Sequence, residues 1–266
     1  MRLLVRELAC FFAAVRFFTR LPVPAWVGHS AELLDAAPRY FPAVGLVVGG
    51  IGAAVFWLAA LVWPQPVAVL LSMAATLYAT GAFHEDGLSD MADGFGGGWT
   101  RERILEIMKD SRVGSYGVTA LILALAGKAT LLSLLPAAWV PAALVAGHAV
   151  SRFCSGALMA LLDYVRGDGA AGGNGASKAR PVAARMSPAA LALAGLFAAA
   201  GLGLWCLLAP PLPLLPALAL ALLATAWLVR LMRRNLGGYT GDCLGAVQQA
   251  SELAFYLGLL ARWPAV

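Results

Sequence analysis

The sequence predicts an all-α integral membrane protein with about seven transmembrane helices and an N-terminal amphipathic helix at the membrane interface. Hydrophobic residues make up 61% of the 266 residues and charged residues only 12%. That charged share is about half the ~25% usual in soluble domains. The apolar residues also fall in blocks of roughly the 20 residues that a helix needs to cross a bilayer. We therefore expect one polytopic membrane domain covering residues 1–266.

The first apolar stretch, Leu3–Phe18, is interrupted by charges at Arg6, Glu7 and Arg16. A cleavable signal peptide would have an uninterrupted apolar region followed by a small-residue cleavage site, and this stretch has neither. We expect it to form an amphipathic helix in the cytoplasmic interface, within an interfacial segment of residues 1–40. The alternative is a buried eighth span whose charges are paired.

Seven apolar blocks follow, and each is long enough to cross a bilayer as a helix. They are Phe41–Trp63, Val67–Phe83, Ser115–Leu135, Ala142–Leu162, Ala189–Ala209, Leu214–Met232 and Leu244–Ala261. The last block is the weakest candidate because it carries Gln248, Gln249 and Glu252. These blocks predict the seven spans.

The distribution of positive charge predicts the orientation in the membrane. Of 19 Lys and Arg, 16 lie in the first forty residues and in the connections 84–114, 163–188 and 230–243. Positive residues mark the cytoplasmic side, so we expect all four stretches in the cytoplasm and the C-terminus outside. The net charge of +5 then reports topology, and no nucleic-acid partner is expected.

The connection after the second span is strongly acidic over residues 84–98, where it carries His84, Glu85, Asp86, Asp90 and Asp93. If the helix of the span continues into it, Asp86, Asp90 and Asp93 lie within about 60° of arc on one face. Carboxylates stacked in this way repel one another unless a cation neutralises them, and a hard divalent ion prefers oxygen ligands. We predict a metal site formed by Glu85, Asp86, Asp90 and Asp93. The alternative is a solvated charged loop.

Features suited to phosphate binding follow the acidic residues. A glycine run ending at residue 98 should stop the helix and free backbone N–H groups to approach an anion. The segment Arg101–Asp110 has the alternation of an amphipathic surface helix, with Glu106 and Asp110 four residues apart. Lys109 and Arg112 supply nearby cations. Carboxylates beside cations and glycines suit a metal-dependent phosphoryl transferase, so we expect residues 84–114 to form a cytoplasmic catalytic loop.

These strings also carry a family resemblance. Phe83–Gly94 and Ile107–Gly117 resemble the signature of the cobalamin synthases, the adenosylcobinamide-GDP ribazoletransferases. Four further strings are similar to that family: Phe17–Pro24, Phe41–Gly45, Ser151–Arg152 and Gly237–Ala246. The resemblance runs in order from about residue 11 to residue 252. It implies a Mg²⁺-dependent enzyme of the bacterial or archaeal inner membrane at the end of cobalamin assembly.

The reaction implied by the resemblance transfers cobinamide phosphate from adenosylcobinamide-GDP to α-ribazole or its 5′-phosphate and releases GMP. For it we expect metal at the four acidic ligands, with Asp110 as a candidate ligand of a second ion. Lys109, Arg112 and Arg152 are expected to hold phosphates, although Arg152 is equally compatible with snorkelling to the interface. The base is His84 or Asp110, and the resemblance assigns Asp242 to the substrate site.

Two other functions fit parts of the pattern. Asp90-x-x-Asp93-Gly94 followed by Glu106-x-x-x-Asp110 is an incomplete version of the carboxylate pattern of CDP-alcohol phosphotransferases. A cation transporter would use the acidic cluster as its ion site, but transport sites usually lie near the membrane midplane, not at the end of a span. The expected partners are the lipid bilayer and the two substrates. A homo-oligomer or a complex with other cobalamin-assembly enzymes stays open.

Overall fold

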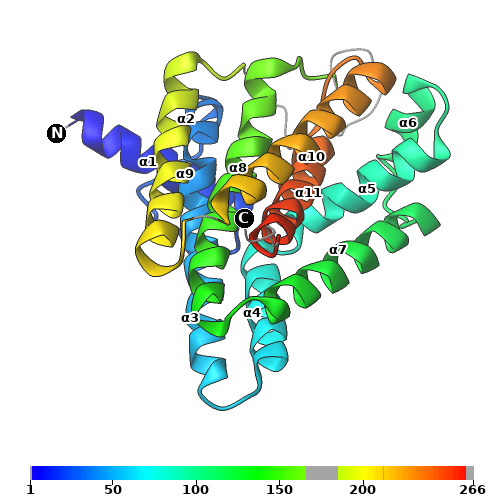
Figure 1. Cartoon of the computed structure of the whole chain (residues 1–266). Coiled ribbons are helices and arrows are strands. Elements are labelled where there is room, and N and C mark those ends of the chain that lie inside the picture. Colours follow the sequence, from blue (N-terminus) through cyan, green and yellow to red (C-terminus); the bar gives the residue numbers. More distant parts are fainter. Residues whose placement is uncertain (1, 166–184, 212, 262–266) are drawn as a thin grey trace.

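The computed structural model describes residues 2–165, 185–211 and 213–261, and these residues form helices without a β-strand (Figure 1). The first elements are α1 (Arg2–Phe18), α2 (Ala31–Ala36), the short 3₁₀ helix η1 (Ala37–Tyr40), α3 (Phe41–Ala60), α4 (Gln65–Thr80), α5 (Phe83–Gly97) and α6 (Arg101–Ile107). They are followed by α7 (Ser115–Leu134), the 3₁₀ helix η2 (Ala137–Trp139), α8 (Val140–Leu161), α9 (Pro188–Leu208), α10 (Leu214–Asn235) and α11 (Gly241–Leu259). The all-α prediction is confirmed.

Five stretches in the described part of the chain are long and apolar enough to cross a membrane. They are Ala31–Ala60, Ser115–Leu134, Ala137–Leu161, Pro188–Leu208 and Leu214–Asn235. A sixth is obtained if α4 and α5, which meet at a bend of 86°, count as one span. The membrane fold is thus confirmed, whereas the number seven stays a prediction.

The predicted last span, α11, does not meet the same test. It is instead an inner helix of the bundle, packed against α10, α5, α8 and α7. Its polar residues Gln248, Gln249 and Glu252 are all buried. These polar residues lower the hydropathy of α11, and they are tolerated because other side chains inside the protein pair with their polar groups.

The N-terminal stretch forms the expected amphipathic helix, α1, and its interfacial location stays a prediction. Cys10 and Phe18 face the bundle, while Leu4 is 66% exposed near the free end of the helix. Glu7 anchors the middle of α1, because its carboxylate pairs with Arg39 at 3.0 Å. The first turns of α1 project from the bundle, so α1 is not buried along its whole length (Figure 1).

The helix of the second span does not continue directly into the acidic stretch. Helix α4 ends at Thr80, and Gly81 takes the left-handed conformation (φ 66°) that caps many helices. Ala82 is also left-handed (φ 56°), at a cost on the order of 1 kcal/mol for a residue with a Cβ atom. This two-residue break turns the chain by 86°, so α5 starts afresh at Phe83.

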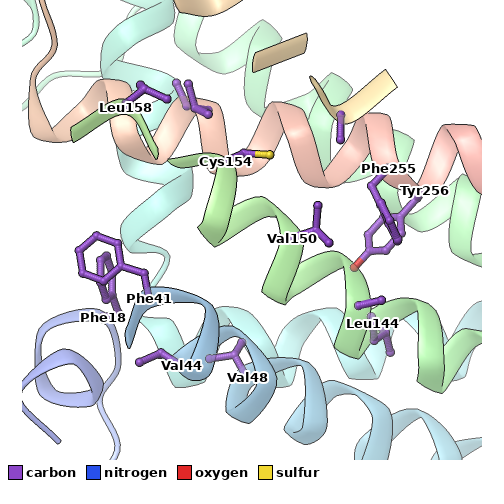
Figure 2. Close-up of a cluster of buried hydrophobic side chains, with 14 of the residues drawn as sticks. Phe18, Phe41, Val44, Val48, Leu144, Val150, Cys154, Leu158, Phe255 and Tyr256 are labelled. Atoms are coloured by element: carbon purple, nitrogen blue, oxygen red, sulfur yellow. The ribbon is translucent and has the colours of Figure 1, made fainter. Parts of the chain in front are cut away.

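Small residues allow the central helices to pack closely, as is usual between membrane helices. A Cβ atom on Gly49 of α3 would lie 2.7 Å from the carbonyl oxygen of Leu144 in α8. Figure 2 shows the core beside this contact, where side chains of α1 and α3 meet those of α8 and α11. The packed frame holds α5 and α7 at its edge, with α6 at their far end (Figure 1).

Candidate functional site

Helix α5, which carries the acidic residues, lies against both α7 and the start of α11. Its contact with α11 is backbone to backbone. A Cβ atom on Gly87 would lie 2.9 Å from the carbonyl oxygen of Asp242, and one on Gly245 would lie 2.9 Å from that of His84. Glycine permits this approach because it has no Cβ atom. The contact brings Asp242 alongside the turn of α5 that carries Asp86.

Three aspartates share one face of α5, as the spacing predicts. Asp86 is exposed, Asp90 is partly buried and Asp93 is buried. The face therefore runs from solvent into the contact with α7. The predicted end of the helix is also confirmed, because α5 stops at Gly97 within the glycine run.

The Asp93 carboxylate accepts hydrogen bonds from backbone N–H groups at the start of α7. Its Oδ2 accepts a hydrogen bond from the Gly114 N–H at 2.7 Å, and its Oδ1 accepts one from the Gly117 N–H at 2.9 Å. The first N–H groups of a helix lack partners within the helix, and a carboxylate there also interacts favourably with the helix dipole. Asp93 thus links the acidic helix to α7, a role the sequence pattern did not reveal.

An open pocket of about 460 Å³ lies where α5, α6 and the start of α7 meet. We call it the α5–α7 pocket, and its charged lining residues are Asp93, Arg103, Glu106, Asp110 and Arg112. It combines carboxylates with guanidinium groups at the end of a helix, a composition suited to a metal-bound phosphate. Lys109 is exposed on the outer surface next to this pocket.

The Asp110 carboxylate is held in a fork by the Arg112 side chain, with a closest N–O distance of 2.6 Å. The backbone N–H of Arg112 donates to the same carboxylate at 3.0 Å. These hydrogen bonds lower the pKa of Asp110 to about 2. Asp110 is therefore ionised at neutral pH and is a weak proton acceptor.

The structure does not gather the predicted metal ligands around one point. Among the described residues, no three His, Cys, Asp or Glu side chains form a group that could hold a metal ion. The helix explains part of this, since the neighbours Glu85 and Asp86 point about 100° apart. Glu85 turns inward, where Gln249 Nε2 donates to its Oε1 at 2.8 Å. The metal role of the four carboxylates stays a prediction.

Glu252, at the middle of α11, is the centre of a buried polar network. Its carboxylate is fully buried, pairs with Lys128 at 3.0 Å and lies 3.3 Å from His148. Gln248 donates to the carboxylate at 2.5 Å, and the Tyr256 hydroxyl donates to it at 3.0 Å. Helices α7, α8 and α11 are thereby joined inside the bundle.

Arg152, a predicted phosphate ligand, belongs to the same interior and is 2% exposed. Its NH1 lies 3.0 Å from His148 Nδ1 and donates to the His148 carbonyl oxygen at 3.2 Å. Arg152 therefore does not snorkel to the surface. Its contact with a phosphate stays a prediction.

Between Glu85 and Arg152 lies a cavity of about 10 Å³ that is also lined by His84 and Lys128. Among the described residues, Glu85 Oε2 and Arg152 Nε have no hydrogen-bond partner. The cavity is close to the size needed for one water molecule, which could satisfy both atoms. His84, a candidate base, is 3% exposed and lies between this cavity and the ring of Phe18.

The polar network had only a partial signal in the sequence. Ionisable residues inside a span, such as Lys128 and Arg152, indicate a functional or paired group, but the partner is set by tertiary packing. The carboxylate that pairs with Lys128 lies on α11, more than a hundred residues away in the chain.

Comparison with known proteins agrees with the resemblance. A family model described as cobalamin-5-phosphate synthase matches residues 10–260. The adenosylcobinamide-GDP ribazoletransferase of Leptothrix cholodnii is 51% identical over 265 residues, which cover 98% of each chain. The enzyme of that name from Shewanella frigidimarina is 48% identical over 97% of this chain and 96% of its own. The one from Ralstonia pickettii is 46% identical over 94% of each chain. No solved structure gives a significant match.

Proposed function

The chain belongs to the cobalamin-5-phosphate synthase family, and from this premise we propose a Mg²⁺-dependent phosphoryl transfer at the acidic face of α5. The protein acts as an adenosylcobinamide-GDP ribazoletransferase in the final stage of cobalamin assembly. A ribose hydroxyl of α-ribazole attacks the phosphorus that carries cobinamide in adenosylcobinamide-GDP. The bond from that phosphorus to GMP breaks, GMP leaves, and the hydroxyl proton passes to a base.

The shared face of Asp86, Asp90 and Asp93 is the observation that carries the metal proposal. All the donors are carboxylate oxygens, the ligands that Mg²⁺ prefers, and Asp86 and Asp90 are not buried. We propose that Asp86 and Asp90 hold the ion, with Asp93 and Asp242 beside them. Bound Mg²⁺ would neutralise the diphosphate and the leaving GMP.

The α5–α7 pocket is the proposed site of the diphosphate. Arg103 and Arg112 line it, and Lys109 is exposed nearby. In the structure each arginine is paired with a carboxylate, Glu106 or Asp110. These exposed pairs are worth little, so a diphosphate can exchange places with the carboxylates at small cost.

Of the two candidate bases, we propose His84. The Arg112 side chain engages both oxygens of the Asp110 carboxylate, which leaves Asp110 poorly placed to accept the proton. His84 lies two residues before Asp86 and next to the backbone contact between α5 and α11. Replacing His84 by glutamine should therefore lower kcat more than replacing Asp110 by asparagine.

We propose that the site faces the cytoplasm of a bacterial inner membrane. The support is that the acidic face, the α5–α7 pocket and most positive residues belong to the same set of connections. Proteoliposomes are separated into those whose protein has α6 on the outside and those whose protein has α6 on the inside. Only the vesicles with α6 on the outside should convert substrates that are added to the external solution. Equal activity of both preparations would contradict this orientation.

GMP release from adenosylcobinamide-GDP and α-ribazole tests the proposed reaction. We expect release by protein in proteoliposomes, loss on addition of EDTA and recovery with excess Mg²⁺. A CDP-alcohol phosphotransferase would instead release CMP from CDP-diacylglycerol. Full activity in EDTA would contradict the metal proposal and leave the family assignment intact.

A further inference from the structure

A second pocket, lined mainly by aromatic rings, lies beside the first turn of α5. We call it the aromatic pocket; its rings are those of Phe17, Phe18, Phe83, His84, Tyr164 and Tyr239. They come from α1, from α5 and from the segments that flank α8 and α11. The pocket has a volume of about 30 Å³. It is separate from the α5–α7 pocket at the other end of α5.

The rings present flat apolar faces in a narrow space. The Phe18 and His84 rings stack with centroids 5.4 Å apart and planes 10° from parallel, and Phe83 meets Phe18 edge-on at 5.6 Å. The rings of Tyr164 and Tyr239 lie 5.5 Å apart on another part of the wall. Such a set of rings suits a flat aromatic ligand, since planar bases stack on aromatic side chains.

Tyr239 adds a hydroxyl that none of the described residues engages. The side chain is 2% exposed, and its hydroxyl has no hydrogen-bond partner among the described residues. A buried hydroxyl without a partner destabilises the fold, and a ligand that accepts its hydrogen bond removes that penalty. Burial, followed by the nearby Tyr164 and Asp163, raises the pKa of Tyr239. The hydroxyl is therefore protonated at neutral pH and available as a donor.

The aromatic pocket adjoins the acidic face of α5, where we place the reaction. His84 in its wall lies two residues before Asp86, and Gly241 in its wall immediately precedes Asp242. The two segments cross in backbone contact at Gly87. A nucleoside with its base in the aromatic pocket would thus have its ribose directed to the carboxylates of α5.

We propose that the aromatic pocket binds the benzimidazole base of α-ribazole, with the Tyr239 hydroxyl donating to the ring nitrogen that carries no sugar. This inference rests on the proposed reaction, because it assigns the acceptor substrate to a subsite of the same centre. A bicyclic base is larger than the pocket as it stands, so Phe17 and Phe18 must move with the end of α1 to admit it. Helix α1 packs mainly on the short helices α2 and η1 and on α3, and at its last turn Phe17 and Phe18 meet the rings of Phe83 and His84 of α5.

The test compares Tyr239→Phe with wild-type protein and with the matched control Tyr78→Phe, whose ring lies 77% exposed on α4. Binding of α-ribazole is measured by calorimetry, and KM is measured for each substrate. Tyr239→Phe should weaken α-ribazole binding and raise its KM about three- to tenfold, with KM for adenosylcobinamide-GDP unchanged. The control should match the wild type. Because the lost hydroxyl has no hydrogen-bond partner in the described part of the chain, the melting temperature of Tyr239→Phe should not fall.

A second variant, Phe83→Leu, retains an apolar side chain and removes one flat face. It should weaken α-ribazole binding about fivefold or more, and inhibition by free benzimidazole should weaken in parallel. Unchanged α-ribazole binding in both variants would overturn the proposal. A rise in KM for adenosylcobinamide-GDP alone would also overturn it, since the pocket would then hold that substrate. If wild-type protein binds α-ribazole but releases no GMP, the proposed reaction fails while the binding comparison still decides the pocket.

Discussion

Replacing Lys128 by methionine should destabilise the bundle, because the change leaves the Glu252 carboxylate buried with no cation paired to it. The two side chains are 8% and 0% exposed, and Lys128 Nζ lies 3.0 Å from Glu252 Oε1. Removing one partner of a buried ion pair costs about 3–5 kcal/mol. For a chain of this size, that loss corresponds to a fall in melting temperature of roughly 6–20 °C. Thermal unfolding in detergent, followed by circular dichroism, measures it.

A double-mutant cycle separates the ion pair from the loss of side-chain packing. Glu252→Gln alone should also destabilise, since Lys128 is then the unpaired charge. The double variant Lys128→Met with Glu252→Gln should be more stable than the sum of the single losses predicts. Lys109→Met, at an exposed lysine, is the matched control and should change stability by less than about 0.5 kcal/mol. The reasoning is refuted if Lys128→Met costs no more than Lys109→Met.

Three further predictions concern α3, α5 and the α5–α7 pocket. Asp93→Asn leaves one acceptor oxygen for two N–H groups, so it should cost about 1–2 kcal/mol and speed amide exchange in the first turn of α7, even in EDTA. Gly49→Ala should cost about 1–3 kcal/mol because α3 and α8 must separate, whereas Gly50→Ala, with open space around it, should cost nothing. Unfolding curves compare the two. The pKa of Asp110 is about 2, so its ion pair is lost only as the pH falls through that value. Arg112→Gln should raise the pKa toward the ordinary 3.8, and carbon NMR of the carboxyl group measures it.

Much of the fold follows from local features that the sequence displays. Apolar length predicts the helices that can span the bilayer, and the spacing of Asp86, Asp90 and Asp93 places them on one face of α5. The glycine run predicts where α5 ends. The break between α4 and α5 had a weaker local signal in Gly81, because a glycine caps a helix only when the following chain turns away. The sequence alone does not predict the left-handed backbone conformation of Ala82.

The site depends on contacts between distant segments, which local patterns do not contain. Glu85 and Asp86 are neighbours in the chain, yet the helix sends one to Gln249 and leaves the other exposed. Asp93 could be recognised as acidic but not as the partner of the first turn of α7. Glu252 made its helix look like a weak span, and packing shows that it is the centre of an interior network. Tyr239 lies in a string that resembles the family, but no role could be assigned to it from the sequence before the rings around it were known.

Mg²⁺-dependent GMP release by the Asp90→Asn variant tests the central claim, which is that the acidic face of α5 holds the metal for the transfer. The matched control is Glu102→Gln, which removes an exposed carboxylate of α6 outside the lining of the α5–α7 pocket. Both variants are reconstituted in proteoliposomes and checked for an unchanged melting temperature in EDTA. We predict that Asp90→Asn is folded but releases no GMP at any Mg²⁺ concentration, while Glu102→Gln keeps wild-type activity. Wild-type GMP release by Asp90→Asn would contradict the account.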